Sequence, residues 1–168
     1  MAYDQHISAA KKIIARCAII TLSDTRTEET DKSGQHIRAL LEQNHHVISA
    51  YHIIPDDPNR LAGLLDQLID QPDVDAILTN GGTGISPRDL TIPVIEKRLT
   101  TLLPGFGELF RMLSFEQIAS GAMLSRALGG IARGKLLFAM PGSTKAVELA
   151  MNRLILPELK HLLRELRK

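Results

Sequence analysis

Four short apolar runs, separated by polar stretches, predict the strands of a sheet. They cover residues 17–22, 47–54, 76–79 and 136–140. The first is an unbroken β-branched run typical of a strand that is buried on both faces. The second, "VISAYHII", mixes apolar and polar positions, which indicates a strand nearer the edge of the sheet.

Helical spacing of apolar residues fills the intervals between these runs. Ile37 and Leu41 follow a possible helix cap at Ser33, and a leucine-rich pattern over 61–69 follows "PDDPN". Residues 145–167 predict a helix or a pair of helices that Pro157 kinks or interrupts. Strands that alternate with helices favour a doubly wound α/β fold, in which helices cover both faces of a mainly parallel sheet.

The stretch of residues 90–126 does not follow this alternation. Its helical patterns are broken by Pro104, Gly105, Gly107 and Gly121. We expect an insertion of helices and loops over one end of the sheet, where it could shape a pocket or a contact between subunits.

Length and composition narrow the class of protein. A chain of 168 residues fits one domain, which we expect to span 1–168. Net charge is +1 and aromatic residues make up 4% of the chain, so a nucleic-acid partner is not expected. Cys17 is the sole cysteine, which excludes an intramolecular disulfide and a thiolate metal cluster.

The apolar runs are all shorter than the roughly 20 residues that span a bilayer, and residues 1–12 lack the apolar stretch of a secretion signal. We therefore expect a cytoplasmic protein without a membrane partner.

The turns that follow the strands are the places to search for a site, because ligands of open parallel sheets bind beyond the carboxyl ends of the strands. After the first strand, "SDTRTEETDKSG" contains Asp24 and Asp31, either in a solvated loop with helix-capping residues or in a site. After the second, Asp57 is a natural helix cap, whereas Asp56 has less structural reason to be there and is a functional candidate.

The third turn, "GGTG", comprises Gly81, Gly82, Thr83 and Gly84. Successive glycines let backbone N–H groups converge on one oxyanion without side chains in the way. The pattern is neither a Walker A loop nor the spaced glycine motif of dinucleotide binders. A tight turn without a ligand is the alternative.

The fourth turn, "MPGSTKA", places Pro141 and Gly142 before a helix that Ser143 or Thr144 would cap. The amides at such a helix start attract anions, although an ordinary capped helix has the same pattern. Two anion-attracting turns on one sheet edge, with nearby carboxylates and Arg88, predict a phosphate-bearing ligand. Carboxylates could hold Mg²⁺ against it.

Other chemistry finds less support in the sequence. His45 and His46 are neighbours that would point to opposite faces of a strand, so they cannot share a metal, and with His52 we expect them at the surface. A nucleophile elbow of the form G-x-S-x-G is absent from the sequence, which argues against covalent acyl chemistry.

Six ordered blocks resemble the MoaB/Mog family of molybdenum cofactor biosynthesis proteins. They are "SDT" with "DKSG", "IIPDD", "TNGGTGISPRD", "PGFGE", "MLSRA" and "MPGSTKA". The resemblance runs from about Ala18 to the C-terminus. The blocks "GELFRMLSFEQI" and "AMPGSTKA" are most similar to the MoaB branch, whereas other branches usually carry a proline after the position of Ser143.

The resemblance implies a trimer, or a hexamer built from trimers, that binds molybdopterin. In the catalytic branch it implies transfer of AMP from Mg-ATP to the terminal phosphate of molybdopterin, with release of pyrophosphate. It also implies an essential pair of carboxylates at Asp56 and Asp89. By the resemblance, Ser125, Gly142 and Ser143 match positions that contact the pterin or a phosphate. The full set of candidate substrate contacts is Gly81, Gly82, Thr83, Gly84, Ser86, Arg88, Ser125, Pro141, Gly142 and Ser143.

Three hypotheses remain open at this point. The chain is a molybdopterin adenylyltransferase, a molybdopterin-binding protein without turnover, or an oligomeric scaffold for other proteins of the pathway. Both carboxylates of the pair are retained here, which favours the enzyme. Thr144, in the place of the usual proline, favours the second hypothesis.

Overall fold

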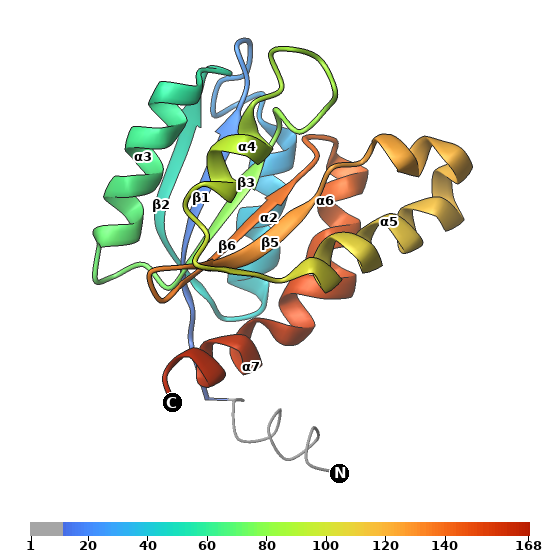
Figure 1. Cartoon of the computed structure of the whole chain (residues 1–168). Helices are drawn as coiled ribbons and strands as arrows, with labels where there is room; N and C mark the ends of the chain where they lie inside the picture. Colours follow the sequence, from blue (N-terminus) through green and yellow to red (C-terminus); the bar gives the residue numbers. More distant parts are fainter. Residues whose placement is uncertain (1–11) are drawn as a thin grey trace.

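A six-stranded mixed sheet organises the chain (Figure 1), and the computed structural model describes residues 12–168. Its strands, in chain order, are β1 (Arg16–Leu22), β2 (Val47–Ile54), β3 (Ala76–Asn80), β4 (Thr101–Leu102), β5 (Leu128–Ala132) and β6 (Lys135–Met140). The predictions made for residues 1–11, that they form no secretion signal and belong to one domain spanning 1–168, lie outside the described residues.

The strand order is β2-β1-β3-β6-β5-β4. The first four run parallel, and β5 and β4 are antiparallel to their neighbours. The predicted α/β fold is confirmed, and so is the place of β2 at one edge. Because β1, β3 and β6 are adjacent and parallel, their carboxyl ends meet at one edge of the sheet.

Helices cover both faces of the sheet, as the alternating pattern predicts. One face carries α2 (Lys32–Gln43), α5 (Pro104–Ile118) and the C-terminal helices α6 (Thr144–Ala150) and α7 (Leu156–Leu166). The other face carries α3 (Pro58–Asp70) and α4 (Thr91–Glu96).

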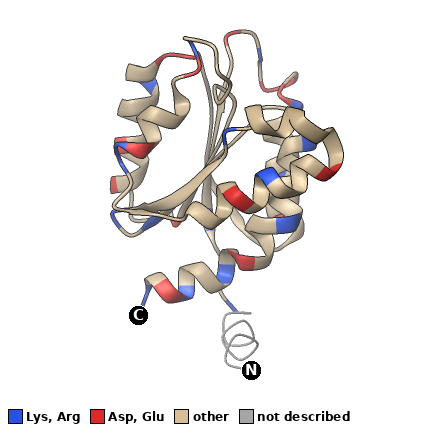
Figure 2. Ribbon diagram, turned by 45° about the vertical axis from the view of Figure 1, so that its right-hand side comes forward, with Lys and Arg blue, Asp and Glu red and all other residues tan. Residues whose placement is uncertain are grey.

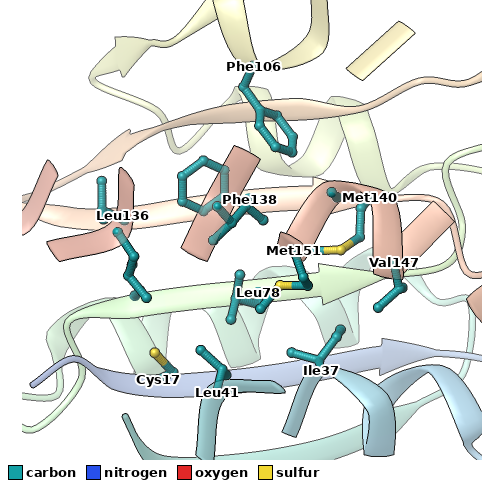
Figure 3. Packing of buried hydrophobic residues seen from close by; sticks show 14 of the residues in the cluster. Cys17, Ile37, Leu41, Leu78, Phe106, Leu136, Phe138, Met140, Val147 and Met151 are labelled. Carbon is teal, nitrogen blue, oxygen red and sulfur yellow. The ribbon is translucent and has the colours of Figure 1, made fainter. Parts of the chain in front are cut away.

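Alternate residues of each strand supply the two cores. Leu78 and Phe138 pack on the first face (Figure 3). Ile19 belongs to the same cluster, whereas Ile20 and Ile77 pack on the second face. Burying each such side chain contributes about 1.5–3 kcal/mol, so the central strands are held firmly from both sides.

Residues 90–126 differ from the expected insertion in one respect. The stretch contains α4, α5 and the 3₁₀ turn η1 (Ala119–Leu124), but it also adds the edge strand β4 to the sheet. Only α5 and η1 project to the side of the molecule (Figure 1). β5 was also not predicted; it forms a hairpin with β6 through Arg133 and Gly134, both of which have positive φ.

The predicted cap of α2 was wrong. Asp31, not Ser33, is the N-cap, and its carboxylate accepts a hydrogen bond from the Gly34 amide at 3.1 Å. Asp31 is fully buried, so it is not part of a solvated loop, whereas Asp24 is exposed. The Asp57 cap of α3 is confirmed, since Asp57 accepts from the amides of residues 59 and 60.

The C-terminal helix is interrupted as Pro157 predicts. A π-helical turn, η2 (Met151–Ile155), joins α6 to α7 directly before this proline. Proline lacks an N–H and its ring crowds the carbonyl four residues earlier, so a wider turn accommodates it without ending the helix.

The prediction that all three histidines lie at the surface was wrong for His46. Its side chain is 5% exposed, and Nδ1 accepts a hydrogen bond from the Ala15 amide at 3.0 Å. Burial, followed by the charges of Lys160 and His45, lowers the pKa of His46 to about 4. His45 is not on a strand; it has a positive φ in the turn before β2.

Charged side chains of both signs are interspersed over the ribbon (Figure 2). Among the helices of residues 12–168, none combines the length and apolar character needed to cross a membrane.

Candidate functional site

A hollow of about 470 Å³ lies at the edge where β1, β3 and β6 end. The loops after β1 and β3 rise above this edge at the top of Figure 1. A larger hollow of about 600 Å³ lies between α5 and α6, but none of the predicted site residues lines it. The smaller hollow is lined by Leu22, Ser23, Thr25, Arg26, Asp56, Gly81, Gly82, Thr83, Gly84, Asp89, Leu124, Ser125, Pro141 and Gly142.

The glycine turn (residues 81–84) forms the floor of this hollow. Gly81 and Gly82 have φ of 98° and 62°, in a region of backbone conformation that residues with a side chain rarely adopt. The amide of Gly81 donates to the Met140 carbonyl at 3.2 Å, and a Cβ added to Gly142 would lie 3.1 Å from the Gly81 Cα. The two predicted anion-attracting turns therefore touch each other.

Asp56 and Asp89 border the glycine turn from two sides. A Cβ added to Gly82 would lie 2.9 Å from Oδ1 of Asp56, and one added to Gly84 would lie 2.7 Å from Oδ2 of Asp89. Asp89 also accepts a hydrogen bond from the Ser86 amide at 2.9 Å. The sheet edge thus brings together two carboxylates that are distant in the sequence.

Asp56 is the more constrained of the two carboxylates. Its Oδ1 is buried and has no hydrogen-bond partner among residues 12–168. Burial raises the pKa of Asp56, the charges of Asp24 and Asp89 raise it further, and Arg88 acts in the opposite direction. An unpaired buried carboxylate oxygen is costly, and a cation or a donor on a ligand would relieve that cost.

Arg88 does not reach into the hollow. It is exposed and forms an ion pair with Asp24, whose Oδ1 accepts from the Asp56 amide at 3.1 Å. Ser86 and Ser143 also lie outside the lining residues, and Ser143 caps α6 by accepting from the Ala146 amide at 3.2 Å. The other predicted substrate contacts all line the hollow.

A buried polar network supports the site from below. Asp31 accepts hydrogen bonds from Tyr51 at 2.6 Å and from Ser33 at 3.1 Å. Burial tends to raise the pKa of Asp31, but donors led by Thr21 and Tyr51 outweigh it and leave that pKa lowered. Asn80, at the end of β3, joins the same network by accepting from Ser33 at 2.8 Å.

Three site-supporting residues were missed by the sequence reasoning. Arg26 donates to the Gly142 carbonyl at 3.1 Å and also pairs with Asp31. Thr91 and Arg126 donate to carbonyls of the glycine turn. Arg126 lies within the quoted "MLSRA" block, which was its only signal in the sequence.

Metal ligation by protein side chains is limited here. Within residues 12–168 no group of three or more histidine, cysteine, aspartate or glutamate side chains is placed to hold an ion. Mg²⁺ is commonly held by one or two carboxylates together with phosphate oxygens of a substrate. Asp56 and Asp89 fit that mode, and the unpaired Oδ1 of Asp56 supplies an oxygen for it.

Comparisons with known proteins agree with the chemistry of the site. Residues 18–161 match the family model described as "Probable molybdopterin binding domain". The chain belongs to the MoaB/Mog family. It is 50% identical to Molybdenum cofactor biosynthesis protein B of Halalkalibacterium halodurans, over all of this chain and 99% of the relative. It is 48% identical to the protein of that name from Bacillus subtilis, with the same coverage.

Solved structures of the MoaB/Mog family share the fold. A crystal structure of Molybdenum cofactor biosynthesis protein B superposes with a TM-score of 0.90 at 52% identity, covering 92% of this chain and 97% of that one. The tungsten cofactor synthesizing protein MoaB from Pyrococcus furiosus gives 0.83 at 34% identity, with coverage of 92% and 98%. The Mog protein from Mycobacterium ulcerans gives 0.80 at 29% identity, with coverage of 92% and 99%.

Proposed function

We propose that this chain acts in molybdenum cofactor biosynthesis by binding molybdopterin and transferring AMP from ATP to its terminal phosphate. One observation carries the proposal: Asp56 and Asp89 flank the glycine turn in a single hollow, and an oxygen of Asp56 is buried without a partner in the described chain. A glycine-rich turn without large side chains, beside two carboxylates, suits a phosphate and its counter-cation together.

In the proposed reaction an oxygen of the molybdopterin phosphate attacks the α-phosphorus of ATP. The bond between that phosphorus and the oxygen bridging to the β-phosphorus breaks, and pyrophosphate leaves. The attacking phosphate is already an anion, so no general base is required. Catalysis would consist of positioning and of hydrogen bonds to the phosphates from the glycine turn and from Ser125, which lines the same hollow.

Mg²⁺ bound with ATP would neutralise charge on the phosphates. Asp56 and Asp89 are the residues proposed to hold it, and both are carboxylates, the ligand type that Mg²⁺ prefers. Burial is the main cause of the raised pKa of Asp56 and repulsion by Asp24 and Asp89 is the next, and a bound cation would relieve both.

Binding without turnover is the second candidate. Thr144 favours it, because this residue stands where other branches of the family usually carry a proline. In that case the hollow would hold molybdopterin and protect it, and ATP would not be consumed.

Self-association to a trimer or a hexamer is proposed as well. Leu109, Met112, Phe115 and Ile118 recur along α5 and are 46–61% exposed, and Met123 on η1 is 79% exposed. An exposed apolar stripe of this length is typical of a contact surface between proteins. The same stripe would serve the third hypothesis, an oligomeric scaffold that binds other proteins of the pathway.

The decisive experiment is pyrophosphate release from Mg-ATP with purified molybdopterin. We expect release to need both substrates and to fall by about 100-fold or more in Asp56→Asn and Asp89→Asn. Asp57→Asn is the matched control, because asparagine caps a helix as well as aspartate does. Molybdopterin binding by calorimetry without any release would leave the binding protein as the function.

A further inference from the structure

All four carbonyls of the glycine turn accept hydrogen bonds from either Thr91 or Arg126. The Gly81 carbonyl accepts from Oγ1 of Thr91 at 3.1 Å, and the Gly82 carbonyl accepts from the Thr91 amide at 3.2 Å. The Thr83 carbonyl accepts from Nε of Arg126 at 2.9 Å. The Gly84 carbonyl accepts from the second guanidinium arm of Arg126.

The directions of these carbonyls fix the directions of the amides that follow them. In a planar trans peptide, the N–H of each residue points opposite to the carbonyl of the residue before it. Fixing the carbonyls of residues 81–84 therefore turns the amides of residues 82–85 away from Thr91 and Arg126. Within residues 12–168 these four amides have no hydrogen-bond acceptor, although Thr83 is buried.

We propose that Arg126, assisted by Thr91, is a positioning residue that orients these amides for a phosphate of the ligand. The inference rests on the proposed function and names the residues that give its phosphate site a fixed shape. A guanidinium suits this role because its planar fork donates several bonds in fixed directions and keeps its charge at any physiological pH. That charge, directly behind the turn, also favours an anion.

A third bond extends the role of Arg126 to the carboxylate. Its guanidinium donates to the Asp89 carbonyl at 2.9 Å, so one side chain sets both the glycine turn and the backbone of Asp89. Thr91 and Arg126 stand at the two ends of the excursion formed by α4, β4, α5 and η1. The two ends of this excursion therefore meet on the glycine turn.

The test is an amide-resolved NMR titration of the full chain, first with inorganic phosphate and then with molybdopterin. In the native chain, the amide signals of residues 82–84 shift with each probe. In Arg126→Ala we expect affinity for both probes to fall about 10-fold or more. Arg126→Lys keeps the charge but not the fork, and we expect it to lose most of the same affinity.

Thr91→Val tests the orientation of a single amide of the glycine turn. It removes the hydroxyl bond to Gly81 and keeps the amide bond to Gly82, so the Gly82 amide signal should change most. Arg111→Ala is the matched control, since Arg111 carries the same charge on α5 and makes no hydrogen bond to the glycine turn. We expect Arg111→Ala to bind both probes as the native chain does.

Native affinity in Arg126→Ala, with the fold intact by NMR, would overturn the proposal. Native affinity in Arg126→Lys alone would also overturn it, because charge and not orientation would then explain the effect. Failure of the proposed function would give a different result. The native chain would bind phosphate through residues 82–84 and lose this binding in Arg126→Ala, but it would not bind molybdopterin. That result would support the positioning role and contradict molybdopterin as the ligand.

Discussion

Gly81 shows how a single missing side chain serves the site. Its φ of 98° and its close approach to the Leu22 carbonyl leave no room for a Cβ. We predict that Gly81→Ala lowers the free energy of unfolding by about 1–3 kcal/mol and weakens phosphate binding. Denaturant unfolding with a phosphate titration would measure both.

The matched control for that substitution is Gly63→Ala. Gly63 lies within α3, and a Cβ there would meet nothing within 4 Å. Alanine at this position should raise the free energy of unfolding by about 0.5–1 kcal/mol, because glycine in a helix interior is unfavourable. Equal destabilisation of both variants would contradict the role given to the Gly81 backbone.

The sequence predicted site residues that have their own chemical signature. Asp56 and the glycine turn closely follow strands, so their shared edge could be inferred from the parallel sheet, whereas the pairing of Asp89 with Asp56 came from the family resemblance. Thr91 and Arg126 could not be inferred in this way, because their partners are backbone carbonyls of a turn that lies several residues or more away in the sequence. The prediction that His46 lies at the surface failed for a related reason, because its burial depends on tertiary packing and not on the spacing of residues in the sequence.

At the scale of elements, α2 is tied to the sheet by its cap. Asp31 caps α2 and also accepts from Tyr51 on β2. We predict that Asp31→Ala lowers the free energy of unfolding by about 2–4 kcal/mol, because it leaves buried donors without an acceptor. Tyr51→Phe should cost only about 1 kcal/mol.

Helix α3 gives a comparison by the same measurement, because it also has an aspartate as its N-cap. Asp57→Ala removes the half-buried N-cap of α3 and should cost about 1 kcal/mol by denaturant unfolding. A loss at Asp31 no larger than the loss at Asp57 would contradict the network beneath the hollow.

Strand prediction succeeded where packing on both faces demands apolar runs, and failed at β5 and β4. The sequence of β5, "LGGIA", has two central glycines, which have low strand propensity. The structure explains both glycines, because a side chain would not fit at either position. A Cβ on Gly129 would approach the Phe138 ring, and one on Gly130 would lie 2.6 Å from the Thr101 carbonyl. Two residues of β4 are too few for any pattern.

At the scale of the whole molecule, His46 makes stability depend on pH. Its pKa is about 4 in the folded chain and about 6.5 when unfolded, so only the unfolded chain binds the proton between these values. Stability contributed by neutral His46 is therefore present above pH 6.5 and is lost as pH falls towards about 4. The loss should reach about 3 kcal/mol.

His46→Asn offers a direct check of this dependence. Asparagine retains an acceptor for the Ala15 amide and does not titrate. Denaturant unfolding from pH 7.5 to 4.5 should show a flatter profile in the variant, whereas parallel profiles would assign the acid loss to other groups.

Self-association is tested by placing charge on the exposed stripe of α5. We predict that Met112→Glu, at a side chain 54% exposed, shifts the chain to smaller species in sedimentation velocity, because a charge would be buried in the contact. Gln67→Glu on α3, at the opposite face of the sheet, should sediment as the native chain does.

The excursion whose ends meet on the glycine turn also carries the apolar stripe of α5. Subunits that assemble through that stripe would restrain both Thr91 and Arg126, and a phosphate on the turn would restrain the same two residues from inside. Thermodynamic reciprocity then requires the two events to favour each other by one common factor. Ligand concentration would thereby become a regulator of quaternary structure, and quaternary structure a regulator of affinity.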